Sequence, residues 1–274
     1  MAQRYVRVQT LLGHLHYGLL QLDRRVLVLD APPWLQGQPT EQELEPDSYQ
    51  ILSPCAPSKI VAVGRNYVKH AAELGNEVPK EPLLFLKPPT TVIPPESTIL
   101  YPPLSQRVDY EGELAVVIGD RCIDCTPEEA RAKIWGYTIA NDVTARDLQR
   151  SDGQWTRGKG FDTFCPLGPW IVREVNPSAL LQTFINDDPN PVQSAPISDM
   201  MFSPEFVVAY ISQVMTLLPG DVVLTGTPEG VGALRVGDRV RVEIEGIGSL
   251  ENPVEARPTP VSATSTTVEP LDEA

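Results

Sequence analysis

The stretch RVDYEGELAVVIGD, residues 107–120, joins two acidic side chains to an apolar run. The run LAVVIG predicts a buried β-strand, and Glu111 and Glu113 stand at its entrance. Side chains two positions apart on a strand point to the same face, so both carboxylates would lie together beside apolar packing. Like charges in such a place repel and raise each other's pKa unless a positive charge separates them. The pair therefore predicts either a bound cation or a strand edge at which both side chains face solvent.

Outward from this strand, the chain consists of short strand-like segments separated by turns that use many of its 28 Pro and 19 Gly residues. Residues 1–52 predict a small N-terminal β-rich domain, and residues 53–256 predict a larger catalytic domain. Residues 257–274 are rich in Pro, Ser and Thr and predict a disordered tail. Because strands dominate and helices are few, we expect a mixed, β-dominated α+β fold.

Three segments carry helical signals. VKHAAELG, residues 68–75, has helical composition and ends on Gly75, a residue that suits the position after a helix. TPEEARAKI has Thr126 as an N-cap and a Pro at the first helical position. FSPEFVVAYISQVMTLLPGD, residues 202–221, spaces its apolar residues at nearly helical intervals and predicts the best amphipathic helix.

Composition excludes several classes of function. The net charge of −14 argues against nucleic-acid binding, which requires a basic surface. The chain opens without the pattern of a signal peptide, and no apolar run reaches membrane-spanning length. A single C-x-x-C, at Cys122 and Cys125, has no second pair to complete a zinc site and predicts reduced thiols. These features predict a cytoplasmic protein without a membrane partner.

A third carboxylate is available for a cation at residues 111–113. Asp142, in IANDVTARD, follows the apolar strand GYTIA at the point where polar residues begin. Three carboxylate oxygens suit a hard cation such as Mg²⁺ or Mn²⁺ and leave coordination positions open for water or substrate. We therefore expect Glu111, Glu113 and Asp142 to form a metal site.

The segment GRNYVKHAAE offers a candidate base. His70 and Glu73 are three residues apart on a predicted helix, so their side chains can meet. A carboxylate that accepts from one imidazole nitrogen makes the other nitrogen a better base. The alternative is a surface His–Glu pair, although Arg65, after a flexible Gly64, could also clamp an anionic group.

Two further segments supply polar groups. TARDLQRSDGQWTRGKG carries Arg146, Gln149 and Lys159 on an irregular, Gly-rich stretch, and cations beside an acidic metal site can bind a carboxylate substrate. LTGTPEGVG lets backbone N–H groups approach a ligand and adds the hydroxyl of Thr227.

Six segments in this order resemble one family: GRNYVKHAAE, PLLFLKPPT, DYEGELAVVIG, NDVTARDLQ, GKGFDTFCPLGPW and LTGTPEGVG. The chain resembles the fumarylacetoacetate hydrolase superfamily over roughly residues 55–256, and within it the fumarylacetoacetate hydrolase domain-containing branch. The resemblance implies a mixed β-sandwich roll with a small N-terminal cap, a homodimer, and a Mg²⁺ or Mn²⁺ site on the three carboxylates.

The resemblance also implies residue roles. His70 and Glu73 would be a catalytic dyad on a lid, and Lys159 would stabilise developing negative charge. The substrate contacts that it implies are Lys87, Arg146, Gln149 and Thr227. Arg65 joins them as the anion clamp suggested above.

The implied substrate is a small 2-oxo acid with a carbonyl or carboxylate at the β position, handled through a metal-stabilised enolate. This predicts an acylpyruvate hydrolase or an oxaloacetate decarboxylase or tautomerase. One alternative is an enzyme of the 2-hydroxyhepta-2,4-diene-1,7-dioate isomerase type. Another is a metal-dependent dicarboxylate binder without turnover.

Overall fold

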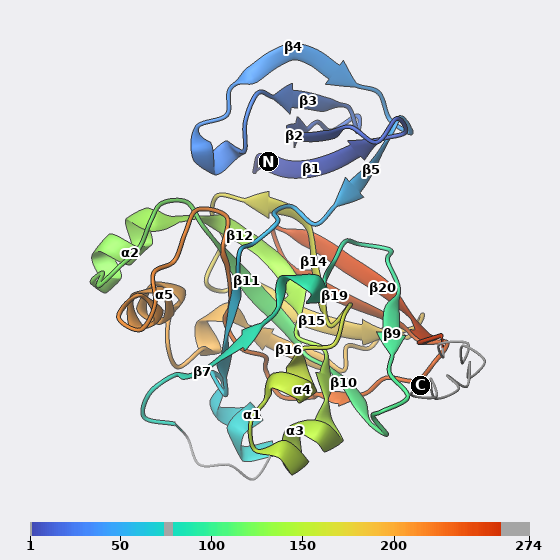
Figure 1. Ribbon diagram of the computed structural model, residues 1–274, viewed down its shortest axis with the longest axis vertical. Helices are drawn as coiled ribbons and strands as arrows, with labels where there is room; N and C mark the ends of the chain where they lie inside the picture. The colour runs from blue at the N-terminus through green and yellow to red at the C-terminus, as the bar shows by residue number, and fades with distance from the viewer. Residues whose placement is uncertain (1, 74–78, 259–274) are drawn as a thin grey trace, which may run out of the picture.

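The computed structural model describes residues 2–73 and 79–258 of the chain. Most strands belong to one large mixed sheet that runs from the N-terminal cap to the middle of the molecule (Figure 1). In spatial order its strands are β4 (Pro39–Leu44), β3 (Val26–Leu29), β2 (Leu15–Leu20), β1 (Arg4–Thr10), β14 (Cys165–Val172), β12 (Ile134–Asn141), β11 (Gly112–Ile118), β17 (Val222–Leu224), β6 (Ile60–Gly64) and β7 (Leu83–Lys87), with β5 (Tyr49–Leu52) on β1 and β8 (Val92–Ile93) on β14.

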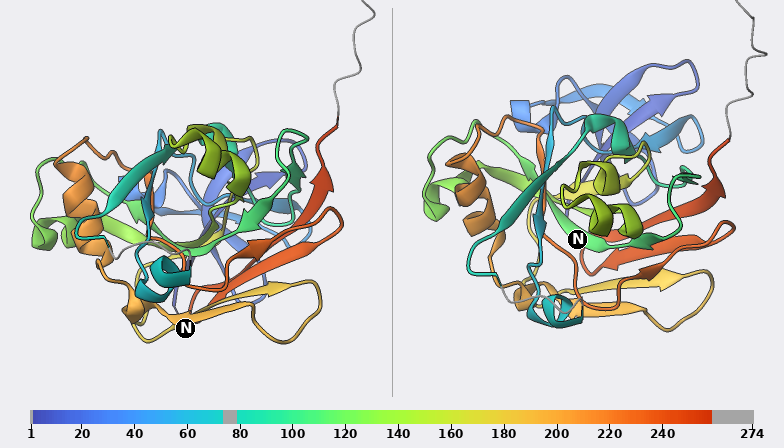
Figure 2. Two further views of the ribbon diagram at one scale, coloured as in Figure 1. Left: turned by 90° about the horizontal axis from the view of Figure 1, so that it is seen from below. Right: turned by 60° about the horizontal axis from the view of Figure 1, so that its bottom comes forward.

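Two smaller sheets complete the β-structure. The five-stranded sheet has the order β16 (Gln193–Pro196), β15 (Leu180–Ile185), β19 (Arg239–Ile244), β20 (Gly248–Ala256) and β9 (Ile99–Tyr101). The three-stranded sheet has the order β13 (Thr144–Ala145), β10 (Val108–Tyr110) and β18 (Gly232–Ala233). Apolar side chains of the large sheet, such as Leu114 and Ile139, pack against Leu181 and Val242 of the five-stranded sheet. The two layers therefore form a sandwich, and the predicted β-dominated α+β fold is confirmed (Figure 2).

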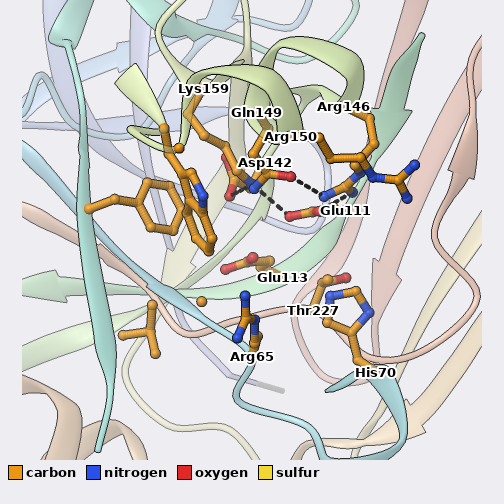
Figure 3. A pocket seen from close by; sticks show the side chains of 15 residues that line it. Arg65, His70, Glu111, Glu113, Asp142, Arg146, Gln149, Arg150, Lys159 and Thr227 are labelled. Carbon is orange, nitrogen blue, oxygen red and sulfur yellow. Dashed lines mark hydrogen bonds and ion pairs between the residues drawn. The ribbon is translucent and has the colours of Figure 1, made fainter. Parts of the chain in front are cut away.

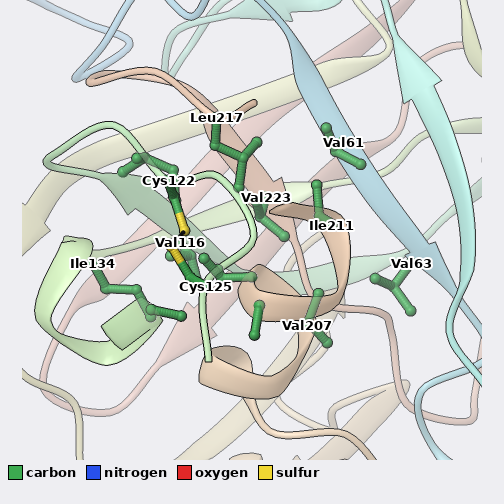
Figure 4. Close-up of a cluster of buried hydrophobic side chains, with 14 residues drawn as sticks. Val61, Val63, Val116, Cys122, Cys125, Ile134, Val207, Ile211, Leu217 and Val223 are labelled. Atoms are coloured by element: carbon green, nitrogen blue, oxygen red, sulfur yellow. Dashed lines mark hydrogen bonds between the residues drawn. The ribbon is translucent and has the colours of Figure 1, made fainter. Parts of the chain in front are cut away.

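The helices are short and lie around the sheets: α1 (Val68–Glu73), α2 (Pro127–Lys133), α3 (Arg146–Asp152), α4 (Thr156–Lys159) and α5 (Pro204–Ser212). Thr126 caps α2 as predicted, in a reciprocal capping box with Glu129. Helices α2 and α5 cover one face of the large sheet, where Val61, Val116 and Val207 belong to one buried apolar cluster (Figure 4). The predicted helix over residues 202–221 is confirmed only in its first half, because residues 213–221 turn back into β17.

Two predictions concern residues that the structure does not describe. The predicted end of the first helix at Gly75 lies in the segment 74–78, and the central part of the predicted lid lies there too. Most of the predicted tail, from residue 259 onward, is also outside the described residues.

Several strand ends meet at one edge of the large sheet. β11 is antiparallel to both β12 and β17, so β11 begins where those two strands end. β6 is parallel to β17 and ends at the same edge. Polar residues that interrupt or follow these strands are therefore brought together, although they are far apart in the sequence.

Candidate active site

The three predicted carboxylates meet at this edge. Glu111 lies between β10 and β11, and Asp142 directly follows β12, whose Asn141 pairs with Gly112. The Asp142 N–H donates to the Glu111 carbonyl at 2.8 Å. One carboxylate oxygen from each of Glu111, Glu113 and Asp142 lies within 4.8 Å of the others, and all three residues are buried (Figure 3). The solvent-facing alternative for the glutamates is therefore excluded.

Glycines make this close approach possible. A Cβ on Gly112 would lie 2.4 Å from Thr183 Oγ1, so no larger residue fits between the two sheets without movement. Gly226 has a φ of +97° and donates its N–H to Glu113 Oε2 at 2.7 Å. Next to it, Thr227 Oγ1 donates to the Gly112 carbonyl at 2.8 Å and ties the LTGTPEGVG loop to β11.

Protein cations surround part of the cluster. The Lys159 amino group contacts Glu111 Oε2 at 2.8 Å and also pairs with Asp142. The Arg146 guanidinium pairs with Glu111 and contacts Asp109 Oδ2 at 2.8 Å. Glu113 differs from its neighbours, because no ion-pair partner exists for it among residues 2–73 and 79–258. Its described partner is the single Gly226 N–H.

The pKa values follow from these partners. Burial favours the neutral acid at Glu111, but Lys159 and Arg146 outweigh it and hold the pKa of Glu111 below its usual range. Burial and the adjacent Asp142 and Glu111 carboxylates raise the pKa of Glu113 well above its usual value. Lys159 is buried too, yet the carboxylates of Asp142 and Glu111 raise its pKa and keep it charged. One carboxylate of the three is thus left without a compensating charge.

The charge and donor atoms of the three carboxylates show whether a divalent cation fits this site. Three carboxylate oxygens form a hard donor set of the kind that Mg²⁺ and Mn²⁺ prefer. A buried carboxylate without a paired cation is costly, and a bound cation removes that cost. The residues present therefore fit the predicted ion.

Lys87 lies behind the carboxylate cluster. Its side chain is fully buried, and its amino group donates to Asp142 Oδ1 at 2.5 Å and to the Val143 carbonyl at 3.2 Å. It does not contribute to the cavity wall of this structure, and its contact with a substrate stays a prediction. A sequence pattern cannot distinguish a lysine that contacts a substrate from one that binds a carboxylate of the site, as Lys87 binds Asp142.

The predicted dyad is assembled. His70 is buried, and its Nδ1 lies 3.4 Å from a Glu73 carboxylate oxygen. The same carboxylate accepts from the Gly230 N–H at 3.1 Å, which connects α1 to the LTGTPEGVG loop. Glu73 lies outside the cavity wall, whereas His70 forms part of it.

Nine of the eleven predicted site residues line one cavity of about 400 Å³, the exceptions being Glu73 and Lys87. Sequence reasoning missed an aromatic wall made by Phe85 and Trp155, whose ring centroids are 5.1 Å apart. It also missed Arg150 in the wall and Asp109 behind Arg146. The signal for Asp109 was present in the stretch RVDYEGE, two positions before Glu111. Among residues 2–73 and 79–258, no helix combines the length and apolarity needed to cross a bilayer.

Comparison with known proteins agrees with the fold. The family model for the fumarylacetoacetate hydrolase C-terminal domain matches residues 59–255, and an N-terminal model, Rv2993c-like, matches residues 3–54. The human mitochondrial oxaloacetate tautomerase FAHD2A is 44% identical over 247 residues, which cover 86% of this chain and 76% of the relative.

Two solved structures are also similar. A 5-carboxymethyl-2-hydroxymuconate delta-isomerase from Mycobacterium smegmatis has a TM-score of 0.86 and 42% identity and covers 93% of this chain and 100% of its own. A fumarylpyruvate hydrolase from Pseudomonas aeruginosa, in complex with Mn²⁺ and pyruvate, has a TM-score of 0.70 and 34% identity, and the match covers 76% of this chain and 92% of that chain. The resemblance in the sequence is confirmed, and the chain belongs to the fumarylacetoacetate hydrolase superfamily.

Proposed function

We propose that this protein is a Mg²⁺- or Mn²⁺-dependent enzyme that acts on small 2-oxo acids with a β-carbonyl or β-carboxylate group. Its reaction would be of the acylpyruvate hydrolase type or of the oxaloacetate decarboxylase or tautomerase type. The observation that carries the proposal is the buried carboxylate of Glu113, which has no ion-pair partner among the described residues and lies beside Glu111 and Asp142 in a cavity that also contains His70 and Lys159.

Glu111, Glu113 and Asp142 would hold the divalent ion, which when bound supplies Lewis acidity for a 2-oxo acid and its enolate. Lys159 directs its ammonium group into the same cluster and would stabilise negative charge that develops on the substrate oxygen. The site excludes much of the bulk water because these side chains are buried, which strengthens each electrostatic contact.

His70 would move the proton. With Glu73 accepting at Nδ1–H, the Nε2 atom of His70 carries the lone pair that takes a proton from the substrate carbon or from water. If His70 returns that proton to another atom of the enolate, the substrate is tautomerised. If His70 instead takes a proton from water, the resulting hydroxide attacks the distal carbonyl and the C–C bond is hydrolysed.

The relatives support this range of substrates. The human relative is named an oxaloacetate tautomerase, and the P. aeruginosa structure contains Mn²⁺ and pyruvate. The M. smegmatis isomerase supports the second candidate, an isomerase acting on a longer unsaturated dioate.

A substrate panel with and without chelator tests the proposal. Oxaloacetate in its keto and enol forms, acetylpyruvate, fumarylpyruvate and 2-hydroxyhepta-2,4-diene-1,7-dioate are assayed with Mg²⁺ and with Mn²⁺. We expect metal-dependent turnover of at least one of the first three compounds. Turnover of the dioate alone favours the isomerase, and no turnover of any compound contradicts the proposal.

Replacing His70 by alanine is expected to lower kcat by about 10²- to 10⁴-fold, the usual contribution of general acid–base catalysis. Affinity for oxalate with Mg²⁺, measured by calorimetry, should change little because the metal ligands remain. His14→Ala serves as the matched control, since His14 is exposed in the N-terminal domain. An unchanged kcat in His70→Ala would remove His70 from the reaction, and binding without turnover in the wild type would identify a dicarboxylate binder.

Metal affinity is expected to fall as the pH is lowered. The pKa of Glu113 is raised, so a proton competes with the cation at pH values where an ordinary glutamate, with a pKa of about 4.3, would be fully ionised. Lower pH favours the protonated acid and hence weaker binding, and binding should release protons. Calorimetric Mn²⁺ titrations in buffers of different ionisation enthalpy measure both effects. Affinity that stays constant as the pH falls toward 5 would contradict the raised pKa.

A further inference from the structure

Arg150 is a cation of the cavity wall that the proposed reaction does not use. It lies on α3, four residues after Arg146, so the two side chains share one side of the helix. Arg146 is buried and committed to Asp109, Glu111 and Gln149. Arg150 is exposed at the cavity wall, and among the described residues it has no hydrogen-bond or ion-pair partner.

The charges along the cavity wall favour an anionic ligand. Among the described residues, four cationic side chains, Arg65, Arg146, Arg150 and Lys159, and three carboxylates line the cavity, and Asp109 pairs with Arg146 behind the wall. The divalent ion of the proposed function would add two positive charges to this wall. A 2-oxo monocarboxylate compensates one charge, whereas a dicarboxylate compensates two and forms a stronger complex in a cavity of low dielectric.

The position of Arg150 suits the distal end of such a ligand. The 2-oxo acid end belongs with the buried carboxylates and Lys159, which leaves the other end near the solvent-exposed part of the wall. Figure 3 shows Arg150 next to Arg146 on one side of the carboxylates, and Arg65 on the other side. Arg65 is half-buried, whereas Arg150 is exposed and can adapt to a ligand.

We infer that Arg150 is a specificity-determining residue that pairs with the second carboxylate of a 2-oxo dicarboxylic acid, an inference that rests on the proposed function. Its planar guanidinium can donate two parallel N–H bonds to a carboxylate. An acylpyruvate with a neutral acyl end would gain nothing from this contact. The substrate class that the site favours is therefore the 2-oxo dicarboxylates, of which oxaloacetate is the smallest example with a β-carboxylate.

Arg150→Gln tests the inference through two substrates. We expect kcat/KM for oxaloacetate to fall about 10- to 100-fold, mostly through KM, because the charge-assisted contact with the distal carboxylate is lost. For acetylpyruvate the change should stay within about 3-fold. Arg121→Gln removes one positive charge from an exposed position outside the cavity and should leave both values unchanged. Equal losses for both substrates, or no loss for either, would overturn the inference.

A binding comparison separates this inference from the proposed function. Oxaloacetate and 2-oxobutanoate share a four-carbon skeleton and differ in the distal carboxylate, and their affinities are measured by calorimetry with Mg²⁺ present. Wild type should prefer oxaloacetate at least about 10-fold, and Arg150→Gln should lose that preference. A preference that depends on Arg150 in a protein without turnover rejects the proposed catalysis and retains the anion site. Absence of a preference in wild type, including failure to bind either compound, rejects the role of Arg150 whether or not turnover is seen.

Discussion

Glu113→Gln is expected to reduce metal-dependent turnover by at least about 100-fold and to leave the fold intact. Loss of a ligand should cost no less than loss of a residue that orients a ligand, which typically costs 10- to 100-fold in metal affinity or activity. Glutamine keeps the shape of the side chain, and its amide oxygen can still accept from the Gly226 N–H. What is lost is the one carboxylate charge that no described protein cation compensates.

Thermal unfolding provides a second readout for Glu113→Gln. The variant removes like-charge repulsion with Asp142 and Glu111, so without metal its Tm should equal or exceed that of wild type. Mg²⁺ or Mn²⁺ should raise the Tm of wild type and have little effect on the variant. Glu128→Gln, on the exposed side of α2, is the matched control. Wild-type turnover in Glu113→Gln would contradict the assignment of the metal site.

Lys159→Met is expected to destabilise the metal-free protein by about 3–5 kcal/mol, the cost of removing one partner from a buried ion pair. The amino group of Lys159 lies between Glu111 and Asp142, and the variant leaves these buried carboxylates facing each other. Methionine fills a similar volume and can still pack near the Phe85 ring, so the loss measures the charge and not a cavity. Urea unfolding in chelator measures the difference.

Added Mg²⁺ should recover part of the stability of Lys159→Met, because a divalent ion can compensate the same carboxylates. Turnover should not recover, since the ammonium group that faces the substrate is absent. Arg157→Met is the control for loss of a cation on the same helix. Its pair with Asp152 is exposed and should contribute no more than about 1 kcal/mol. A loss below about 1 kcal/mol for Lys159→Met would show that Lys159 does not compensate the cluster.

Much of the fold was predictable because local signals agreed with the final packing. The strand over residues 112–118 is buried on both faces, as its unbroken apolar run indicated. Helix α2 begins where Thr126 and the following Pro predicted. The helix predicted over residues 202–221 was too long, because apolar spacing continues past Ser212 into a segment that packs in the core without helical geometry.

The identity of most cavity residues was also available in the sequence, since polar residues that interrupt apolar strands rarely occur without a use. Lys87 shows where this reasoning ends. PLLFLKPPT predicts a strand with a polar end, and it says nothing about whether the amino group reaches solvent, a ligand or Asp142. The tertiary structure places the Lys87 amino group 2.5 Å from Asp142 Oδ1.

Residue type and local spacing were sufficient for the strands, the capped helix and the acidic pair, because these depend on neighbours within a few positions of the chain. The division of charge in the cluster depended on tertiary structure. Lys159 reaches Glu111 across 48 residues and Arg146 reaches Asp109 across 37, and such partners are chosen by the way β11 and β12 bring their ends together. Coulomb energy depends on distances and burial in space. Only the folded chain could therefore reveal that, within the part of the chain that the structure describes, Glu113 and Arg150 have no ion-pair partner.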